Sequence, residues 1–380
     1  MTTVYLIRHA EAEGNLYRRI HGQYNSLVTT RGKKQIAELG KRFADTRVDF
    51  VYSSDLLRAR ETAAVISGSH GLELVSTQQL REVNMGAWED LTWGEVERFE
   101  PEQLEHFNND PTLWKVDGCE DFYSLQRRLT SAIRGIAAKH DGKTVAVVSH
   151  GSALRTFMSG VLNVPPQEIK RIPHSDNTAV ALLRIDKGSV TVEYQSDNSH
   201  LTEELSTFAH QKWWRENTTF DSSNLRFTPF DLINDAARYL AYRRGAWEPV
   251  YGAVPPPDNW LNNAAINAQA HSHAVSLALI GDTPAGLIEL DTKQGSDENS
   301  GEIEFFYMEH EHRRTGIAVQ LLGQAVSVFR SLGREKIRMS VSERNEQTLG
   351  FCEKYGFNRI GEYDGTGGRH VMLEMDIAVK

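Results

Sequence analysis

Two short apolar runs in the first half of the chain each lead directly to a histidine. Residues 3–7 are followed by Arg8 and His9, and residues 144–148 are followed, after one serine, by His150. Continuous apolar runs of this length are typical of buried parallel strands. In open α/β sheets, ligands bind just beyond the carboxyl ends of such strands. The pattern therefore predicts a site with two histidines at one sheet edge, and the arginine before the first histidine favours an anionic substrate.

Length and composition narrow the class of protein. A chain of 380 residues is long enough for about two domains of ordinary size. No run approaches the ~18 apolar residues of a membrane span, and the N-terminus lacks the pattern of a signal peptide. The two cysteines, Cys119 and Cys352, form no disulfide framework or zinc pattern, and a net charge of −9 disfavours general nucleic-acid binding. We therefore expect a cytoplasmic protein that binds neither nucleic acid nor membranes.

The order of apolar and helical patterns predicts two domains. In residues 1–205 they alternate as in βαβ units, with strands expected at 3–7, 50–53, 144–148 and 179–185 and helices at 30–43, 56–67, 124–139 and 153–160. A polar stretch poor in aliphatic residues predicts a linker over residues 206–224. A second, α+β series fills residues 225–380, with helices expected at 229–244, 260–269, 317–332 and 346–355 and strands at 274–281, 285–292, 302–308, 336–341 and 370–377.

Polar residues of the first half can be combined into a site for phosphoryl transfer. A phosphoryl group needs fixed positive charge on its oxygens, and Arg8 and Arg58 offer planar, permanently charged donors. A neutral imidazole can attack phosphorus, and the two arginines favour the neutral form of His9 because like charges oppose its protonation. A carboxyl with a raised pKa can protonate the leaving oxygen, and Glu82 is the candidate. We expect His150 to donate a hydrogen bond to the phosphate oxygens.

These segments resemble the histidine phosphatase superfamily, in its phosphoglycerate mutase-like branch. The resemblance rests on elements in the same order along about 200 residues, which are residues 8–15, 22–35, 52–63, 82–89 and 149–151. It implies a three-layer α/β/α domain and a reaction that needs no metal. It also implies the catalytic roles. By this resemblance His9 is the nucleophile and Glu82 is the proton donor. The phosphate-binding residues are Arg8, Arg58 and His150. Asn15 and Gly151 are further candidates for binding the phosphate.

Phosphatases and mutases of this superfamily share that set of residues. The short separation of Glu82 and His150 resembles that of the compact phosphatases, whereas the cofactor-dependent mutases carry a longer insertion there. We therefore favour hydrolysis of a phosphomonoester and keep mutase-type phosphoryl transfer as the alternative. Asn25 stands where an aspartate is usual and Ala12 replaces a frequent threonine or serine, so the sequence leaves the substrate open.

The second half carries a motif suited to a pyrophosphate. An expected strand, a turn that contains Gly316 and the start of a helix present free backbone N–H groups to an anion, and the glycine permits close approach. The pattern Arg313-x-x-Gly316-x-Ala318 resembles the acetyl-coenzyme A loop of GNAT N-acyltransferases. Asn345 and residues 351–357 resemble the later motif of that family. The resemblance implies that acetyl-CoA is the acyl donor and that it is bound by Arg313, Arg314, Thr315, Gly316, Ile317, Ala318 and Asn345.

Acyl transfer to an amine also requires a base and an acid. Glu302 and Glu304 alternate with Ile303 on one expected strand, so both share a face and either can take the proton; a solvated strand face is the plain alternative. Many members of the family have a tyrosine after the phenylalanine of the later motif, where it can protonate the leaving thiolate. Here Cys352 occupies that position, and Tyr355 follows about one helical turn later. The general acid therefore stays open between these two residues.

The two resemblances together predict a bifunctional enzyme. Its expected substrates are a small-molecule phosphomonoester and a small-molecule or peptide amine. An alternative is that the second domain binds acyl-CoA only to sense it and to regulate the phosphatase. A further hypothesis is that both domains act in succession on one metabolite, first removing phosphate and then acetylating an amine.

Overall fold

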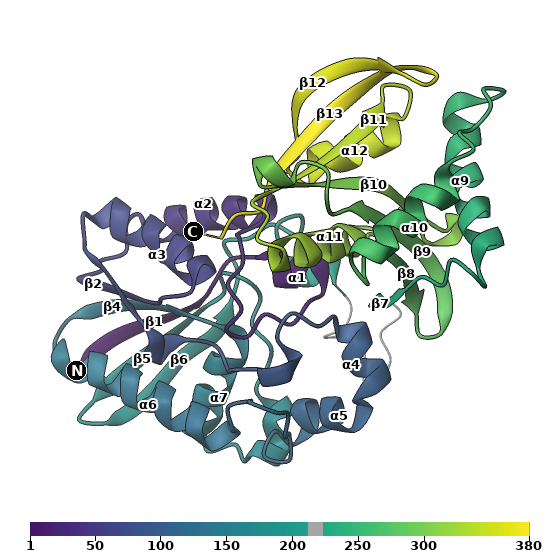
Figure 1. Ribbon diagram of the computed structural model, residues 1–380. Helices are drawn as coiled ribbons and strands as arrows, with labels where there is room; N and C mark the ends of the chain where they lie inside the picture. The colour runs from purple at the N-terminus through teal and green to yellow at the C-terminus, as the bar shows by residue number, and fades with distance from the viewer. Residues whose placement is uncertain (212–222, 380) are drawn as a thin grey trace. The chain divides into compact units, whose positions relative to one another are not determined.

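A computed structural model describes residues 1–211 and 223–379 and divides into two compact units (Figure 1). The first unit comprises Met1–Leu91 and Val96–Asp221, and the second comprises Thr92–Glu95 and Ser222–Lys380. Most of the predicted linker over residues 206–224 lies outside the described residues. None of the helices in the described part of the chain is long and apolar enough to span a membrane.

The first unit is built on a sheet of six strands in the order β3-β2-β4-β1-β5-β6. The strands are β1 Thr2–Arg8, β2 Phe50–Ser54, β3 Leu74–Thr77, β4 Thr144–Ser149, β5 Val180–Asp186 and β6 Ser189–Asp197. The first four are parallel to one another, and β5 and β6 are antiparallel to their neighbours. Arg8 pairs with Ser149 at the carboxyl ends of β1 and β4. The residues that follow, His9 and His150, therefore leave the sheet side by side.

Helices cover both faces of this sheet, which confirms the three-layer α/β/α fold. Figure 1 shows α2 and α3 on one face and α6 and α7 on the other. Side chains of α2 and α3 pack against strand residues such as Ile7 and Val148 in one apolar core. The helices are α1 Glu13–Tyr17, α2 Thr30–Phe43, α3 Leu57–His70, α4 Trp93–Phe99, α5 Pro101–Asn109, α6 Phe122–Lys139, α7 Gly151–Val161 and α8 Thr207–His210.

The α2 helix shows how the sequence specifies one of these layers. The Thr29 hydroxyl accepts a hydrogen bond from the amide of Gly32 at 3.0 Å, which caps the first turn. Gln35, Leu39 and Phe43 then recur every four residues and are completely buried. That spacing places them on one face of the helix, which packs against the sheet.

The second unit is an α+β domain with seven strands in the order β12-β13-β11-β10-β9-β8-β7. The strands are β7 Arg226–Pro229, β8 Val275–Ile280, β9 Thr283–Asp291, β10 Ser300–Met308, β11 Lys336–Ser342, β12 Asn358–Gly365 and β13 Gly368–Asp376. Its helices are α9 Ala236–Tyr251, α10 Trp260–Ala270, α11 Val319–Ser331 and α12 Glu346–Lys354. Only β10 and β11 pair in parallel, and the other pairings are antiparallel.

The sequence missed four strands, and each of them lies at an edge of its sheet. β3 and β6 end the first sheet, and β7 and β12 end the second. β3 and β12 are partly or fully exposed, and β7 has only four residues, so their patterns are weak. β6 alternates Val190, Val192 and Tyr194 with polar residues, so its pattern was present and was overlooked. The helix expected over 229–244 was also wrong in its start, since α9 begins only at Ala236. The Asp231 carboxylate accepts hydrogen bonds from the amides of Ile233 and Asn234, and this turn delays the helix.

Candidate active sites

The ring of His9 is held in one orientation at the end of β1. Its Nδ1 lies 2.7 Å from the carbonyl oxygen of Ala10, so Nδ1 carries the proton and donates it to that carbonyl. The Asn177 side chain donates to the carbonyl of His9 at 2.9 Å and fixes the backbone. Nε2 makes no hydrogen bond within the described residues and is therefore the nitrogen with a free lone pair.

Buried cationic and polar groups surround this histidine. The side chain of Arg58 is 2 % exposed, and Arg8 donates from Nη1 to the carbonyl of Ser175 at 2.5 Å. The ring of His150 lies 5.1 Å from the ring of His9, between centroids. Nε of Arg8 and both ring nitrogens of His150 are buried and have no hydrogen-bond partner among the described residues. Buried polar groups are normally paired, so these atoms are suited to an anionic ligand.

Burial and positive charge keep both histidines neutral. The pKa of His9 is lowered well below its ordinary value by burial first and then by the charges of Arg58 and Arg8. Burial and the charge of Arg58 likewise lower the pKa of His150. Burial lowers the pKa of Arg58 to about 10, which still leaves it protonated at pH 7. The site therefore combines fixed positive charge with an uncharged imidazole, as nucleophilic attack on phosphorus requires.

Glu82 lies at the first turn of α7. Its carboxylate accepts hydrogen bonds from the amides of Val83 at 2.9 Å, Ser152 at 2.9 Å and Ala153 at 2.7 Å. These bonds favour the charged form, but burial outweighs them and raises the pKa of Glu82. A carboxyl balanced in this way is suited to both giving and taking a proton.

Asn15 and Gly151 are the other two candidates for phosphate binding. Asn15 contacts the backbone near His9, and Gly151 lies beside Arg8. Asn15 Oδ1 accepts from the amide of Ala12 at 3.1 Å and lies 3.4 Å from Asn177 Nδ2. Gly151 begins α7, and a Cβ added there would lie 3.3 Å from Nε of Arg8. The glycine therefore leaves room for the guanidinium of Arg8. Within the residues that the structure describes, no group of three or more His, Cys, Asp or Glu side chains is placed to hold a metal ion.

In the second unit, two parallel strands part from each other. β10 and β11 pair from Ser300 and Lys336 to Ile303 and Met339 and then diverge. The pairing of β10 with β9 shifts between Ile303 and Phe305, so a bulge lies at the same point. Diverging parallel strands leave backbone donors and acceptors open to a ligand.

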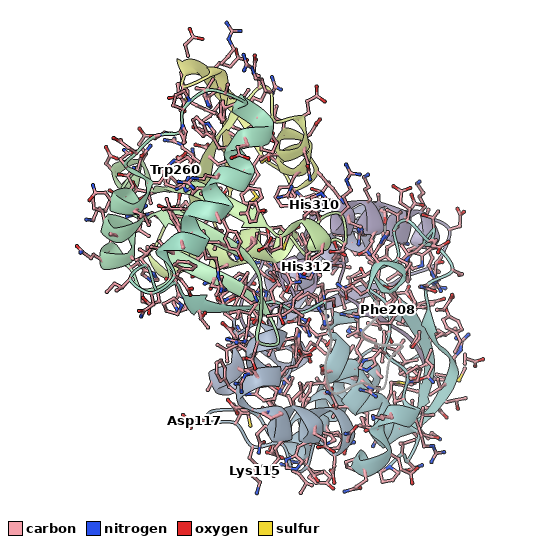
Figure 2. The ribbon with its side chains drawn as sticks, turned by 90° about the vertical axis from the view of Figure 1, so that its right-hand side faces the viewer. Lys115, Asp117, Phe208, Trp260, His310 and His312 are labelled. Atoms are coloured by element: carbon pink, nitrogen blue, oxygen red, sulfur yellow. The ribbon has the colours of Figure 1, made fainter. Side chains whose placement is uncertain are left out.

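The loop after β10 presents backbone amides at the start of a helix. The segment that follows β10 contains His310 and His312, which are labelled in Figure 2, and leads into residues 313–318. Gly316 has φ +91°, and a Cβ added there would meet nothing within 4 Å, so its surroundings are open. No backbone carbonyl in the described part of the chain accepts from the amides of residues 316–318. This arrangement fits a pyrophosphate at the N-terminus of α11.

The remaining candidates from the loop and the later motif have structural partners. Arg313 Nε donates to the carbonyl of Met308 at 2.9 Å and thereby ties the loop to the end of β10. Asn345 Oδ1 accepts from the amide of Thr348 at 3.1 Å and caps α12. Asn345 therefore orients the helix that carries residues 351–354.

Glu302 and Glu304 lie where the two strands diverge. Ile303 between them is buried, whereas Glu302 is half-buried and Glu304 is exposed. Burial and the neighbouring charge of Glu304 raise the pKa of Glu302 to about 7. Such a carboxyl is ionised in part at neutral pH and can accept a proton there.

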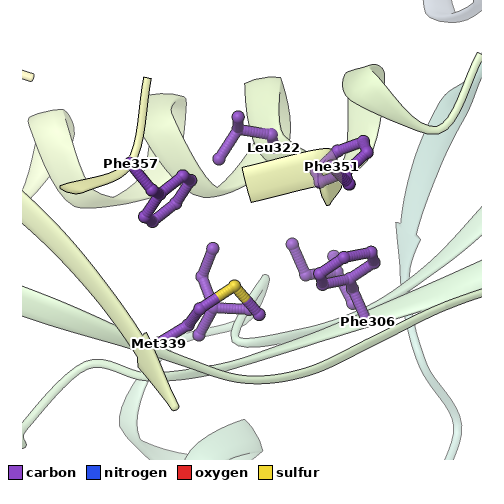
Figure 3. A pocket seen from close by; sticks show the side chains of 7 residues that line it. Phe306, Leu322, Met339, Phe351 and Phe357 are labelled. Carbon is purple, nitrogen blue, oxygen red and sulfur yellow. The ribbon is translucent and has the colours of Figure 1, made fainter. Parts of the chain in front are cut away.

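The surroundings of Cys352 argue against a role as proton donor. Its side chain is fully buried, its Sγ lies 3.3 Å from Sδ of Met339, and burial raises the pKa of the thiol to about 12. Met339, Phe351 and Phe357 line a cavity of about 10 Å³, which is too small for a ligand. Figure 3 shows these side chains around it. Cys352 therefore belongs to the apolar core. Tyr355 ends α12 with its ring 4.8 Å from that of Phe351, between centroids, and stays a candidate.

Comparison with known proteins decides the family. Residues 4–198 match the model of the histidine phosphatase superfamily (branch 1). The chain belongs to this superfamily. Residues 239–357 match the acetyltransferase (GNAT) family, so the same chain carries a GNAT domain.

Individual relatives match the histidine phosphatase domain. Phosphoglycerate mutase-like protein 4 of Arabidopsis thaliana is 30% identical over 204 residues, which cover 53% of this chain and 87% of that protein. Probable phosphoglycerate mutase GpmB of Escherichia coli O1:K1 is 30% identical over 172 residues, 45% of this chain and 80% of that protein. The structure of Bacillus stearothermophilus YhfR is 32% identical with a TM-score of 0.51, covering 53% of this chain and 99% of that one.

Two features of the histidine phosphatase domain were not foreseen from the sequence. One is Asn177, which binds the carbonyl of His9 from a segment far along the chain. The other is the binding of Glu82 by the amides of Ser152 and Ala153. Nothing in the local sequence pattern distinguishes Asn177. The predicted start of a helix after His150 was the only signal that backbone amides there could bind Glu82.

Replacing Arg58 tests the electrostatic account of His9. Because the charge of Arg58 lowers the pKa of His9, the change Arg58→Met should raise that pKa. His9 should then become protonated at higher pH, as measured from its ¹⁵N chemical shifts in histidine-labelled protein. Arg60 lies on the exposed side of the same helix, so Arg60→Met is the control and should leave the pKa unchanged. An unaltered or lower pKa in Arg58→Met would contradict the account.

Proposed function

We propose that the first unit hydrolyses phosphomonoesters, without a metal, through a phosphohistidine on His9. The observation that carries this proposal is the hydrogen bond from Nδ1 of His9 to the Ala10 carbonyl. It leaves the lone pair of Nε2 free beside the unpartnered donors of Arg8 and His150. A neutral nucleophile next to buried donors is the arrangement that phosphoryl transfer to a histidine needs.

The reaction has two steps. Nε2 of His9 attacks phosphorus and the bond from phosphorus to the ester oxygen breaks, while Glu82 gives its proton to the leaving alkoxide. Arg8, Arg58 and His150 bind the phosphoryl oxygens. Water then attacks the phosphohistidine, Glu82 takes a proton from that water, and the N–P bond breaks. The products are an alcohol and inorganic phosphate, and the enzyme returns to its starting state.

Phosphoryl transfer of the mutase type is the second candidate. Two relatives are named as phosphoglycerate mutases or as similar to them, which favours this reading. The short chain segment between Glu82 and His150 favours hydrolysis. Release of phosphate rather than isomerisation of the ester distinguishes the two reactions.

Phosphate release from a panel of phosphomonoesters tests the first activity. Release should persist with EDTA present and should fall by about 10³-fold or more in His9→Ala, because the nucleophile is lost. His271→Ala, in the second unit, is the control and should release phosphate at the parent rate. Loss of activity in EDTA would refute a metal-free reaction, and equal activity in His9→Ala would refute the phosphohistidine route.

Changing Glu82 should separate the two steps. Glu82→Gln should hydrolyse alkyl phosphates about 10²–10⁴ times more slowly, because their alkoxides need a proton on leaving. With p-nitrophenyl phosphate, whose leaving group needs no proton, we expect a burst of one nitrophenolate per enzyme followed by slow turnover. Rapid-mixing absorbance measures the burst. Equal slowing of the first step for both ester types would rule out Glu82 as the acid.

We also propose that the second unit acetylates an amine. The amides of residues 316–318 and the side chains near them would bind the pyrophosphate of acetyl-CoA. When bound, acetyl-CoA supplies an acetyl thioester. Glu302 takes a proton from the acceptor ammonium at the point where β10 and β11 diverge, directly or through water, so that the amine nitrogen has a free lone pair. Tyr355 is the candidate donor of a proton to the leaving thiolate.

A panel of primary amines tests this activity and its base. Below pH 7 Glu302 is protonated and cannot act as base, so the pH–rate curve of kcat/KM should bend near pH 7. In Glu302→Gln the bend should disappear and the rate should fall by about 10²-fold, measured as release of free CoA. Glu353→Gln, an exposed change on α12, is the control. A bend that persists in Glu302→Gln would assign the base elsewhere, and no turnover with any amine would favour the sensing role.

A further inference from the structure

A short loop encloses the guanidinium of Arg58. Arg58 donates hydrogen bonds to the backbone carbonyls of His21 at 3.0 Å, Gly22 at 2.7 Å and Tyr24 at 2.9 Å. Carbonyl oxygens accept but cannot neutralise, so these contacts orient the cation and leave its charge available to a ligand. The position of Arg58 therefore depends on the conformation of residues 21–24.

One carboxylate holds that loop from the other side. Glu89 accepts four backbone hydrogen bonds at 2.7–3.1 Å, from the amides of Gly22, Gln23, Tyr24 and Met85. Three consecutive amides pointing at one carboxylate are an anion-binding nest, here occupied by a side chain of the same protein. Two of these residues, Gly22 and Tyr24, therefore bind Glu89 through their amides and Arg58 through their carbonyls.

The same loop also contacts the backbone of the proposed acid. Gln23 Nε2 donates to the carbonyl of Glu82 at 3.2 Å. Space around the loop is tight, since a Cβ added at Gly22 would lie 2.5 Å from Oε1 of Glu89 and from the Val83 carbonyl. The loop is thus packed between Glu89 and the segment that carries Glu82.

We propose that Glu89 is a positioning residue that sets both the phosphate-binding Arg58 and the proton donor Glu82 through the loop of residues 21–24. Glu89 positions these groups through the backbone, since its four hydrogen bonds are all made to amides of this chain. Its negative charge also acts on Arg58, whose pKa it raises against the lowering by burial. The inference rests on the proposed phosphatase function. A carboxylate is required because both of its oxygens accept hydrogen bonds. A glutamine has one acceptor oxygen, and its NH₂ group would face amide donors.

Substitution of Glu89 by glutamine tests the role with little change in volume. In the full-length protein, Glu89→Gln should weaken binding of inorganic phosphate, measured by calorimetry, by about tenfold, because hydrogen bonds to a charged group are lost. It should raise KM for a phosphomonoester and lower kcat as well, since Arg58 and Glu82 are both displaced.

The neighbouring residue provides a matched control. Asp90 bonds the side chains of Arg19 at 2.9 Å and His21 at 3.2 Å. Asp90→Asn therefore changes a neighbouring carboxylate whose contact with His21 is to the side chain and not to the backbone amide. The thermal unfolding temperature of each variant measures its stability. Asp90→Asn should bind inorganic phosphate more tightly than Glu89→Gln, even where both variants unfold at the same temperature. If two variants of equal unfolding temperature bound inorganic phosphate with equal affinity, the inference would be overturned.

A second variant covers the case in which Glu89→Gln does not fold. Gly22→Ala pushes the loop away from Glu89, so a folded Gly22→Ala protein should also bind phosphate more weakly, and parent-like binding in it would overturn the inference. Failure of the proposed function gives a different result, because the parent protein itself would then release no phosphate. Parent activity with unchanged phosphate affinity in Glu89→Gln would defeat only the positioning role.

Discussion

The parallel pairing of β1 with β4 determines where the candidate active-site residues of the first unit lie. Because Arg8 pairs with Ser149, the next residues of the two strands, His9 and His150, meet at one sheet edge with their rings 5.1 Å apart. The helix that starts after His150 then offers its first amides to Glu82. A shift of one residue in this pairing would turn every side chain of the shifted strand to the other face of the sheet and separate the two histidines.

Burial of positive charge is the second constraint. Arg8 and Arg58 are held by backbone carbonyls, which orient them without cancelling their charge. Burial and then the charges of these arginines lower the pKa of His9 and keep it neutral, while burial raises the pKa of Glu82. One buried environment thus produces an uncharged nucleophile and a carboxyl that is easily protonated. Removing these cations from water is costly, so the carbonyl contacts around them are part of the site and not only of the fold.

The sequence predicted the central elements well, because buried strands give continuous apolar runs and the two histidines follow them directly. It missed β3, β6, β7 and β12, which lie at the sheet edges. β3 and β12 are largely exposed and β7 has only four residues, whereas β6 does alternate apolar and polar residues and could have been predicted. The sequence also did not identify the residues that act through backbone contacts. Glu89 was visible only as part of a family motif, and Asn177 binds His9 from a distant segment. Cys352 was a candidate by position in a motif, and only its packing on Met339 removes it.

The central claim is that a phosphoryl group is carried by Nε2 of His9. The most direct measurement is rapid quenching of the full-length protein during turnover of a phosphomonoester, followed by peptide mass spectrometry under alkaline conditions, which preserve phosphohistidine. The account predicts one phosphoryl group, labile to acid, on the peptide that contains His9. With p-nitrophenyl phosphate, whose leaving group needs no proton, it predicts a larger amount of phosphohistidine in Glu82→Gln, because only the second step is slowed there. A phosphoryl group on another residue, or hydrolysis with no phosphorylated enzyme in either protein, would contradict it.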